Sequence, residues 1–370
     1  MHVHDCVPDL ATTIVTECRA LGFHRVGITP VEPAQRHELY RAWLAAGHAG
    51  EMAYLREPFH VDTRRDPRAL FAEAKTVVAV ALAYGDMVPA SRIARYARGA
   101  DYHLVLREKL DRLSERIDEA AGRPIARRLC VDTAPVLERD LAERAGLGFV
   151  AKNTMLIAPG LGSYVVLGEM LLAVEVPPLA VEPVRKRCGT CRACIDACPT
   201  GAFVDEYVLD ARKCISYLTI ELAGPIPHEL RGKMGTMIFG CDICQEVCPF
   251  NGGPGSLVAA PELAAHKHVP ELTALLELGA AQFRRFVKRT ALRRVHRQQL
   301  LRNVCIALGN AGDSSAIPAL RRALVDRHPL VRGHAAWALG RLGDRATLTE
   351  RSEIETDPYV LGELRRALSS

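Results

Sequence analysis

The chain has 370 residues, of which 49% are hydrophobic and 25% charged, fractions typical of a globular protein rather than a disordered or fibrous one. That length allows two or three domains with separate cores. The N-terminus carries no basic stretch followed by an apolar run, so we expect no secretory signal. The longest apolar stretches are 76–84, too short to span a bilayer, and 164–176, which contains two glutamates. We therefore expect a soluble, cytoplasmic protein with no membrane partner.

Positive charge is concentrated toward the C-terminal end. The formal net charge at pH 7 is +5, but residues 281–370 contain 17 Lys and Arg against 8 Asp and Glu, which leaves −4 for the remainder. This asymmetry indicates a basic surface that meets an acidic partner.

Helical and strand patterns alternate in residues 1–176. The spacing of apolar positions predicts helices at 10–23, 102–122 and 136–148, and strands at 25–29, 76–84, 127–131, 154–158 and 164–176. This alternation indicates an α/β domain, although it does not predict the strand order. A different region, 177–254, lies between a proline-marked entry and a glycine-rich exit at 251–256.

From about residue 272 the pattern is entirely helical. Residues 300–331 resemble 331–360 at an offset of 31, so that Ala307-Leu308-Gly309 aligns with Ala338-Leu339-Gly340 and Gly312-Asp313 with Gly343-Asp344. This period predicts stacked helix pairs of the HEAT type, and two unrelated helical hairpins are the alternative. We thus expect three domains, at 1–176, 177–254 and 272–370.

Eight of the 12 cysteines lie in compact runs that end in Cys-Pro. Without an export signal, metal binding is favoured over a disulfide framework. The other four lie among apolar residues, and we interpret them as ordinary buried thiols: Cys6, Cys18, Cys130 and Cys305.

The clustered cysteines follow the spacing of bacterial ferredoxins, in which three cysteines hold one [4Fe-4S] cluster and the fourth reaches a second. The second run has its first cysteine moved upstream by an inserted loop, 214–240. Cluster 1 is expected to take Cys188, Cys191, Cys194 and Cys248, and cluster 2 to take Cys198, Cys214, Cys241 and Cys244. Structural zinc is the alternative, but it needs no Cys-Pro endings. A double-cluster, ferredoxin-like domain that relays electrons is therefore predicted.

No dinucleotide-binding or phosphate-loop motif follows any predicted strand. The tripeptide Asp101-Tyr102-His103 matches the start of the Asp-x-His-x-x-Gly motif that supplies a cobalt ligand in one cobalamin-binding fold. Leu106 occupies the glycine position, so that fold is not indicated.

The chain resembles the epoxyqueuosine reductases over nearly its whole length. The resemblance lies in IARYARGADYHLVL (93–106), VDTAPVLERDLAERAGLGFVAKNTMLI (131–157), GSYVVLGEMLL (162–172), CISYLTIELAGPIP (214–227), the cysteine runs and the helical tail. It implies reduction of epoxyqueuosine to queuosine at wobble position 34 of tRNAs with GUN anticodons (Asp, Asn, His and Tyr acceptors), the last step of queuosine synthesis. It also implies base-off cobalamin, two [4Fe-4S] clusters, an N-terminal domain akin to that of reductive dehalogenases, and a low-potential donor such as ferredoxin or flavodoxin. We expect a monomer.

The resemblance assigns Asp132 as the proton donor to the departing epoxide oxygen. A carboxylic acid can serve at neutral pH if an apolar site raises its pKa. From the residues alone, an Asp between a strand and Pro135 is more often a turn or helix cap. The expected cobalamin contacts, each of which could equally be structural, are Arg56, Tyr96, Ala97, Asp132, Lys152, Asn153, Leu156, Gly162, Ser163, Leu167 and Ser216.

The basic segment near residue 290 is the expected tRNA surface, because neutralised phosphates release counterions and unstacked loop bases are open to contact. A solvated helix face is the alternative. The expected contacts are Thr219, Glu221, Arg284, Arg285, Lys288, Arg289, Arg293, Arg294, Arg297 and Arg302. Two other functions remain open: a cobalamin-dependent small-molecule reductase of the reductive-dehalogenase type, and a non-catalytic electron carrier.

Overall fold

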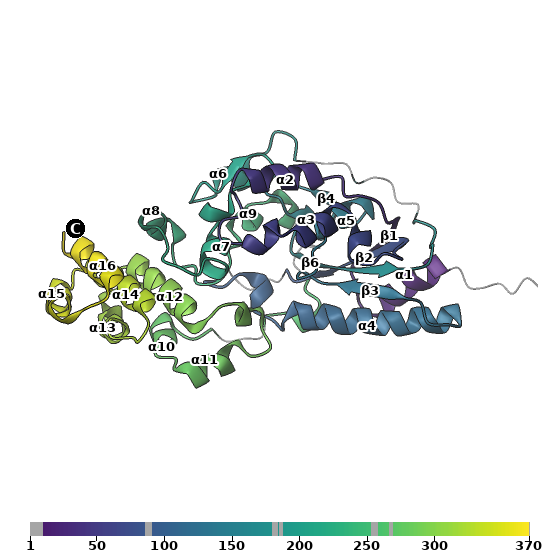
Figure 1. Ribbon diagram of the computed structural model, residues 1–370. Helices are drawn as coiled ribbons and strands as arrows, with labels where there is room; N and C mark the ends of the chain where they lie inside the picture. The colour runs from purple at the N-terminus through teal and green to yellow at the C-terminus, as the bar shows by residue number, and fades with distance from the viewer. Residues whose placement is uncertain are drawn as a thin grey trace, which may run out of the picture.

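A computed structural model describes residues 10–85, 91–179, 184, 188–252, 258–265 and 269–369 (Figure 1). Its N-terminal part is built on a four-stranded sheet of order β1-β2-β6-β3 in which every pairing is antiparallel. The strands of this sheet are β1 (Arg25–Pro30), β2 (Thr76–Ala83), β3 (Arg127–Cys130) and β6 (Val165–Leu172). The predicted strands at 25–29, 76–84, 127–131 and 164–176 are thereby confirmed.

Alternating side chains of β2 set the two faces of the sheet. Val78, Val80 and Leu82 pack with the long helix α4 (Tyr102–Ala121) and with α1 (Leu10–Ala20). The alanines between them face α5 (Glu138–Arg144) and the hairpin of β4 (Phe149–Val150) with β5 (Leu156–Ile157). Because these alanines are small, α5 can lie close to the sheet. Gly27 of β1 serves the same end, since a Cβ there would be 2.0 Å from the carbonyl oxygen of Ala145, just after α5.

Capping residues define both ends of α4. The Asp101 carboxylate accepts a hydrogen bond from the His103 backbone N–H, as an N-cap does. Gly122, at φ 64°, provides the left-handed C-cap. Helices α2 (His37–Ala45) and α3 (Pro58–Arg65) lie in a stretch for which the sequence analysis predicted no element.

The cysteine region is made of short elements around turns. These are α6 (Ala193–Asp196), β7 (Phe203–Asp205), β8 (Val208–Leu209), α7 (Ile215–Ile220), α8 (His228–Arg231) and α9 (Ile243–Glu246). α6 and α9 follow equivalent positions of the two cysteine runs and contact each other. α7 and α8 belong to the inserted loop and pack against the C-terminal helices.

The C-terminal part is helical, as predicted, and its helices form a stack at one end of the molecule (Figure 1). They are α10 (Leu272–Leu276), α11 (Ala280–Val287), α12 (Arg297–Ala311), α13 (Ile317–Ala323), α14 (Pro329–Arg341), α15 (Arg345–Ile354) and α16 (Pro358–Ser369). α12 packs on α14 and α14 on α16, which is the arrangement of a helical repeat. None of the helices in the described part of the chain has the length and hydrophobicity that a membrane crossing needs.

The repeated glycines explain the sequence period. A Cβ at Gly309 would be 2.8 Å from the Trp337 ring, and a Cβ at Gly340 would be 2.8 Å from the Ala367 side chain, so each glycine allows its helix to lie against the next. Gly312 and Gly343 have φ values of 71° and 78° and end their helices in the left-handed region.

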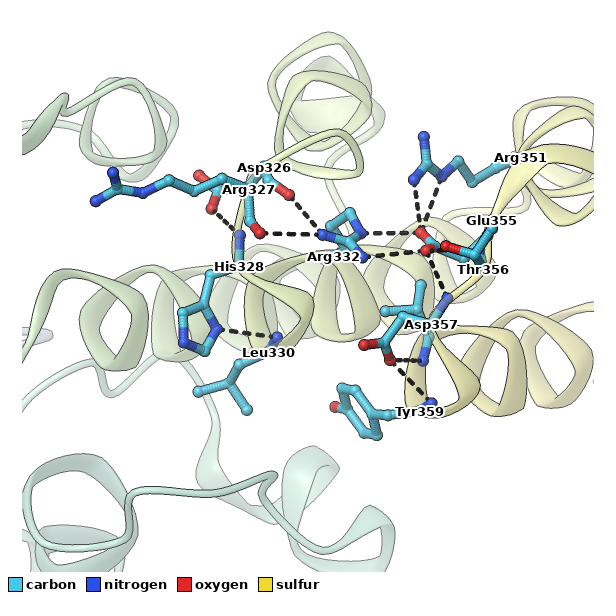
Figure 2. A network of polar contacts seen from close by, with 11 residues as sticks. Asp326, Arg327, His328, Leu330, Arg332, Arg351, Glu355, Thr356, Asp357 and Tyr359 are labelled. Atoms are coloured by element: carbon cyan, nitrogen blue, oxygen red, sulfur yellow. Dashed lines mark hydrogen bonds and ion pairs between the residues drawn. The ribbon is translucent and has the colours of Figure 1, made fainter.

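A buried ion-pair network joins successive helices of the stack (Figure 2). Glu355 receives two hydrogen bonds from the Arg332 guanidinium, at 2.8 and 3.0 Å, and two from Arg351. Its carboxylate also accepts the backbone N–H groups of Thr356 and Asp357. These contacts hold the start of α16 against α14 and α15.

Candidate functional site

The four cysteines assigned to cluster 1 line one small cavity. Cys188, Cys191, Cys194 and Cys248 surround a volume of about 160 Å³. Burial, followed by the charges of the three other thiols, raises the pKa of Cys194. Cys191 is exposed and the others are half-buried. The fold thus brings these four residues together although up to 60 positions separate them in sequence.

The cysteines assigned to cluster 2 are also neighbours of one another. Burial, and then the charges of Cys214 and Cys198 among others, raises the pKa of Cys241 to about 12. Burial raises the pKa of Cys244, with contributions from Cys214, Cys241 and one thiol of the first set. In the described part of the chain no three Cys, His, Asp or Glu side chains close around a single ion. A four-iron cluster holds its thiolates further apart than a single ion does.

A larger cavity, of about 390 Å³, lies between the sheet and the inserted loop. Its walls come from β5, β6, α7 and the segments around the N-termini of α4 and α5. They contain Tyr84, Tyr96, Tyr102, Asp132, Glu138, Arg139, Met155, Leu156, Ser163, Val165, Val166, Leu167, Ser216, Ile220, Glu221 and Arg294. The wall therefore combines nine apolar or aromatic side chains with seven polar ones, five of which are charged.

Asp132 is the centre of a charged cluster in this wall. Its Oδ2 lies 3.1 Å from Nε2 of His103 and 3.0 Å from Nη1 of Arg294, and Arg294 also donates to Glu221 over 2.8 Å. Tyr102, next to His103 in the chain, lines the same cavity. Burial would raise the pKa of Asp132, but the hydrogen bond from His103 and the positive charge of Arg294 outweigh it and lower the pKa. The condition under which a carboxylic acid serves at neutral pH, a pKa raised by an apolar site, is therefore not met by Asp132 in this arrangement.

The backbone at Asp132 is left-handed, with φ 50°. Few side chains other than Asn and Asp adopt this region readily. The Asp132 N–H donates to Oε1 of Glu138 over 2.5 Å, which fixes the turn between β3 and α5. Burial, followed by the negative charge of Asp132, raises the pKa of Glu138.

Polar contacts join the larger cavity to the second cysteine set. The Ser163 hydroxyl donates to Oε1 of Gln245 over 2.9 Å and accepts from Nδ2 of Asn251 over 2.9 Å. Gln245 follows Cys244 directly, and Ser216, on the facing wall, lies two residues after Cys214. The two cysteine sets and the cavity therefore lie next to one another.

Comparison with known proteins agrees with this arrangement. Residues 187–251 match the model of a 4Fe-4S double cluster binding domain, and 287–369 match HEAT repeats. Residues 64–133 match the model described as epoxyqueuosine reductase QueG, DUF1730. An epoxyqueuosine reductase of Xanthomonas campestris is 40% identical, and the similarity covers 90% of this chain and 97% of that protein. The chain belongs to the epoxyqueuosine reductase family.

Solved structures of this family have the same fold. One is a crystal structure of epoxyqueuosine reductase with an epoxyqueuosine-modified tRNA-Tyr stem loop. Its sequence is 34% identical to this chain, and the superposition has a TM-score of 0.86 and covers 98% of this chain and 99% of that one. The Bacillus subtilis reductase, 33% identical with a TM-score of 0.85 and the same coverage, is described with its catalytic aspartate loop swung out of the active site. The expectations of family, fold class and enzymatic activity are thereby confirmed, as is the double-cluster domain.

Six of the predicted cofactor contacts of this family member line the larger cavity: Tyr96, Asp132, Leu156, Ser163, Leu167 and Ser216. Gly162 lies beside it, with Oδ1 of Asn251 only 2.0 Å from where a Cβ would be. Two others line the cluster 1 cavity instead. The Nζ of Lys152 pairs with Glu206 at 2.7 Å, and Asn153 reaches the Cys244 carbonyl at 3.5 Å.

Two further cofactor assignments do not fit the cavity. Arg56 is exposed on the surface, where Nη1 lies 3.4 Å from the Gly50 carbonyl. Ala97 is buried in the core between the cavity and the helical stack, packed with Ile220 and Phe239. The sequence could not distinguish Ala97 from Tyr96, because a single residue separates a cavity wall from the core behind it.

Most of the predicted tRNA contacts form an exposed strip across α11 and the 3₁₀ turn η9 (Ala291–Arg294). The strip contains Arg284, Arg285, Lys288, Arg289, Arg293 and Arg294. Arg294 is both a member of the strip and a part of the cavity wall. Glu221, assigned to the same partner, also lines the cavity.

Three of those assignments are corrected by the structure. Arg302 is fully buried and donates to the carbonyls of Leu218, Leu222 and Gly224. Thr219 is fully buried as well, its hydroxyl bonded within α7 and to the Gly240 N–H. Arg297 is bonded to Asp326 at 2.8 Å and to the Leu278 carbonyl. Their polar groups hold the fold together rather than face a partner.

The sequence analysis missed His103 and Glu138 as members of the site. His103 belongs to the Asp101-Tyr102-His103 tripeptide, which was compared only with a cobalt-binding motif. Its position at the N-terminus of a helix, beside an N-cap Asp, was the available signal. Of the thiols interpreted as ordinary, Cys18, Cys130 and Cys305 are buried, and Cys6 lies outside the described residues.

Proposed function

We propose that this enzyme reduces epoxyqueuosine to queuosine at wobble position 34 of tRNAs with GUN anticodons, with cobalamin held in the larger cavity. The observation that carries the proposal is the position of Asp132. Its carboxyl lies in a cavity with one wall beside Cys244, through Ser163 and Gln245, and the facing wall beside Cys214, through Ser216. A reductive site needs an acid and an electron source at the same place.

The cavity has the character that a corrin requires. Its wall combines apolar side chains, which suit the faces of a large ring, with the hydroxyls of Ser163 and Ser216 for the polar edge. Glu138 and Arg139 are shared with a second cavity, of about 330 Å³ and lined by Tyr40 and Trp43 among others, which gives room for a long cofactor.

The chemistry that bound cobalamin supplies is low-potential electron transfer to the epoxide. The residues of this chain supply and transfer the protons. Conversion of an epoxide to an alkene breaks two C–O bonds, forms one C=C bond, consumes two electrons and two protons, and releases the oxygen as water. Asp132 is positioned to deliver a proton to that oxygen.

Electrons are proposed to enter at cluster 1 and to pass to cluster 2, since Cys191 is exposed and the cluster 2 ligands lie next to the cavity. The donor is a low-potential carrier such as ferredoxin or flavodoxin. The tRNA is proposed to lie on the basic strip, because Arg294 continues that strip into the cavity where the flipped base must reach. The three segments 1–176, 177–254 and 272–370 would thus hold the corrin, the clusters and the tRNA.

The test is conversion of epoxyqueuosine-containing tRNA by anaerobically reconstituted protein with a low-potential reductant, with and without cobalamin. Nucleoside mass spectrometry is the readout. Queuosine should form only with cobalamin, be lost in Asp132→Asn, and persist in the matched control Asp111→Asn on the exposed side of α4. If cobalamin is bound and reduced but the epoxide survives in the unmodified protein, the tRNA assignment is wrong and small-molecule acceptors must be sought.

A further inference from the structure

This inference rests on the proposed function, in which the deoxygenation consumes two protons. The groups around Asp132 favour the ionised form of its carboxyl, which carries no proton. Two donors lie within hydrogen-bond distance of its Oδ2, His103 and Arg294. Each stabilises the ionised form. A carboxylate in this state can transmit a proton but does not store one, so the store must lie on a neighbouring group.

His103 has the geometry of such a store. Its ring lies between two carboxylates, with Nδ1 2.7 Å from Oδ1 of Asp101 and Nε2 3.1 Å from Oδ2 of Asp132. The Asp101 side chain is completely buried, and the His103 side chain is 18% exposed. The Tyr102 ring stacks on the imidazole with 4.0 Å between centroids. The ring is therefore fixed in orientation, directed at the reacting end, and still open to solvent protons.

The charges around His103 favour its protonated form. Burial opposes the charge, but the hydrogen bonds to Asp101 and Asp132 outweigh burial and raise the pKa of His103 to about 9. The other charged or titratable groups that face this cluster from the packed elements are Tyr96, Tyr102, Glu138, Glu221, Arg293 and Arg294. Of these, the two arginines are cations, and each lies beside one of the carboxylates. At neutral pH the proton that Asp132 lacks is therefore on His103.

We propose that His103, oriented by Asp101, loads Asp132 with the protons that the epoxide oxygen receives. The Nε2–H bond of His103 breaks as an O–H bond forms on Oδ2 of Asp132, and the Asp132 O–H bond breaks as one forms on the leaving oxygen. No electrons are exchanged within this relay. The neutral imidazole keeps its Nδ1–H bond to Asp101 and regains a proton from solvent, and a second passage completes the water molecule. His103 acts through Asp132 and is a positioning and proton-loading residue.

The experiment is a single-turnover rate of queuosine formation against pH, in enzyme loaded with both clusters and reduced cobalamin. In the unmodified enzyme the rate should fall at alkaline pH as His103 loses its proton. His103→Gln keeps a donor toward Asp132 but cannot load it, so the rate at neutral pH should fall about 100-fold, and that alkaline limb should vanish. Asp101→Asn keeps an N-cap for α4 but removes the charge, so the alkaline limb should move to lower pH.

Two controls separate a proton role from a structural one. His228→Gln removes another histidine paired with a carboxylate, Glu363 at 2.9 Å, outside the cavity, and should leave the pH profile unchanged. Added imidazole should partly restore His103→Ala if the site is otherwise intact. A His103→Gln profile that coincides with the unmodified one, or an Asp101→Asn limb that does not move, overturns the relay. If the unmodified enzyme itself forms no queuosine, it is the proposed function that fails.

Discussion

Nη2 of Arg302 donates a 2.7 Å hydrogen bond to the carbonyl oxygen of Leu218, and so joins the first long repeat helix, α12, to the helix α7 that lines the cavity. Nη1 of the same guanidinium reaches the carbonyls of Leu222 and Gly224. Beside it, the Asn303 amide donates to the Thr219 and Ile238 carbonyls. The wall that presents Ser216 and Glu221 is thus held from behind by the repeats.

Arg302→Met should destabilise the protein by about 2–4 kcal/mol, because three buried carbonyls lose their donors. Arg302 is 0% exposed, and this burial lowers its pKa to about 10. Urea denaturation of the cluster-loaded protein measures the change, with Arg285→Met as the exposed control. If Arg302→Met leaves stability unchanged but weakens tRNA binding, Arg302 contacts the tRNA and the structural role argued here is wrong.

Glu355→Gln should lower stability by about 2 kcal/mol at pH 7, because the largely buried guanidinium groups of Arg332 and Arg351 lose the negative charge that pairs with them. Burial opposes ionisation of Glu355, but hydrogen bonds from these two arginines outweigh it and lower its pKa to about 2. A lowered carboxyl pKa stabilises the fold above the ordinary value of 4.5. The difference between variant and unmodified protein in urea should therefore narrow as pH falls below 4.5. A difference that is constant from pH 7 to pH 4 contradicts the ion-pair account.

Neutralising the basic strip should reduce the salt dependence of tRNA binding. The slope of log K against log salt concentration should fall by about 0.9 for each phosphate that Arg284→Gln, Arg285→Gln, Lys288→Gln, Arg289→Gln or Arg293→Gln leaves without its cation. Filter binding of an anticodon stem loop at several salt concentrations measures this slope. Arg116→Gln and Arg123→Gln, on and just after the exposed C-terminal part of α4, are the controls. If the strip variants and the control variants give equal slopes, the strip does not contact the tRNA and is an ordinary solvated surface.

Cys191→Ala should lower the bound iron from about eight to about four atoms per chain, because it removes a ligand from one of two four-iron clusters. Cys241→Ala should have the same effect through the other cluster, and the double variant should bind almost no iron. Cys18→Ala, at a buried thiol outside both sets, is the control. Iron analysis of anaerobically reconstituted protein is the measurement. A single variant that retains all its iron contradicts the assignment of that cysteine.

Local signals in the sequence were sufficient for much of the fold. The apolar run of β2, the helical spacing of α4 and the Leu-Gly period of the repeats each involve neighbours in sequence, and each of these elements formed where it was predicted. Cysteine spacing likewise predicted which thiols meet. The antiparallel order of the sheet was not predictable, because strand pairing depends on long-range contacts that periodicity does not record.

The chemistry of the site was less predictable, for the same reason. Asp132 meets His103 across 29 positions of sequence and Arg294 across 162, and these contacts together lower its pKa against the effect of burial. Arg302 lies in a basic run of the sequence like its neighbours, yet it is fully buried. Whether a cation faces a partner or the backbone of its own chain is decided by the packing of the segment around it.

The left-handed backbone at Asp132 restricts which substitutions can report on its chemistry. Asn tolerates this conformation almost as well as Asp, so Asp132→Asn changes the acid and little else. Glu keeps the acid but prefers other backbone regions and carries its carboxyl one bond further, so the chemically conservative replacement is the structurally disruptive one. Libraries that vary this turn should therefore recover Asn and Gly as folded proteins more often than Glu, in spite of the lost carboxyl.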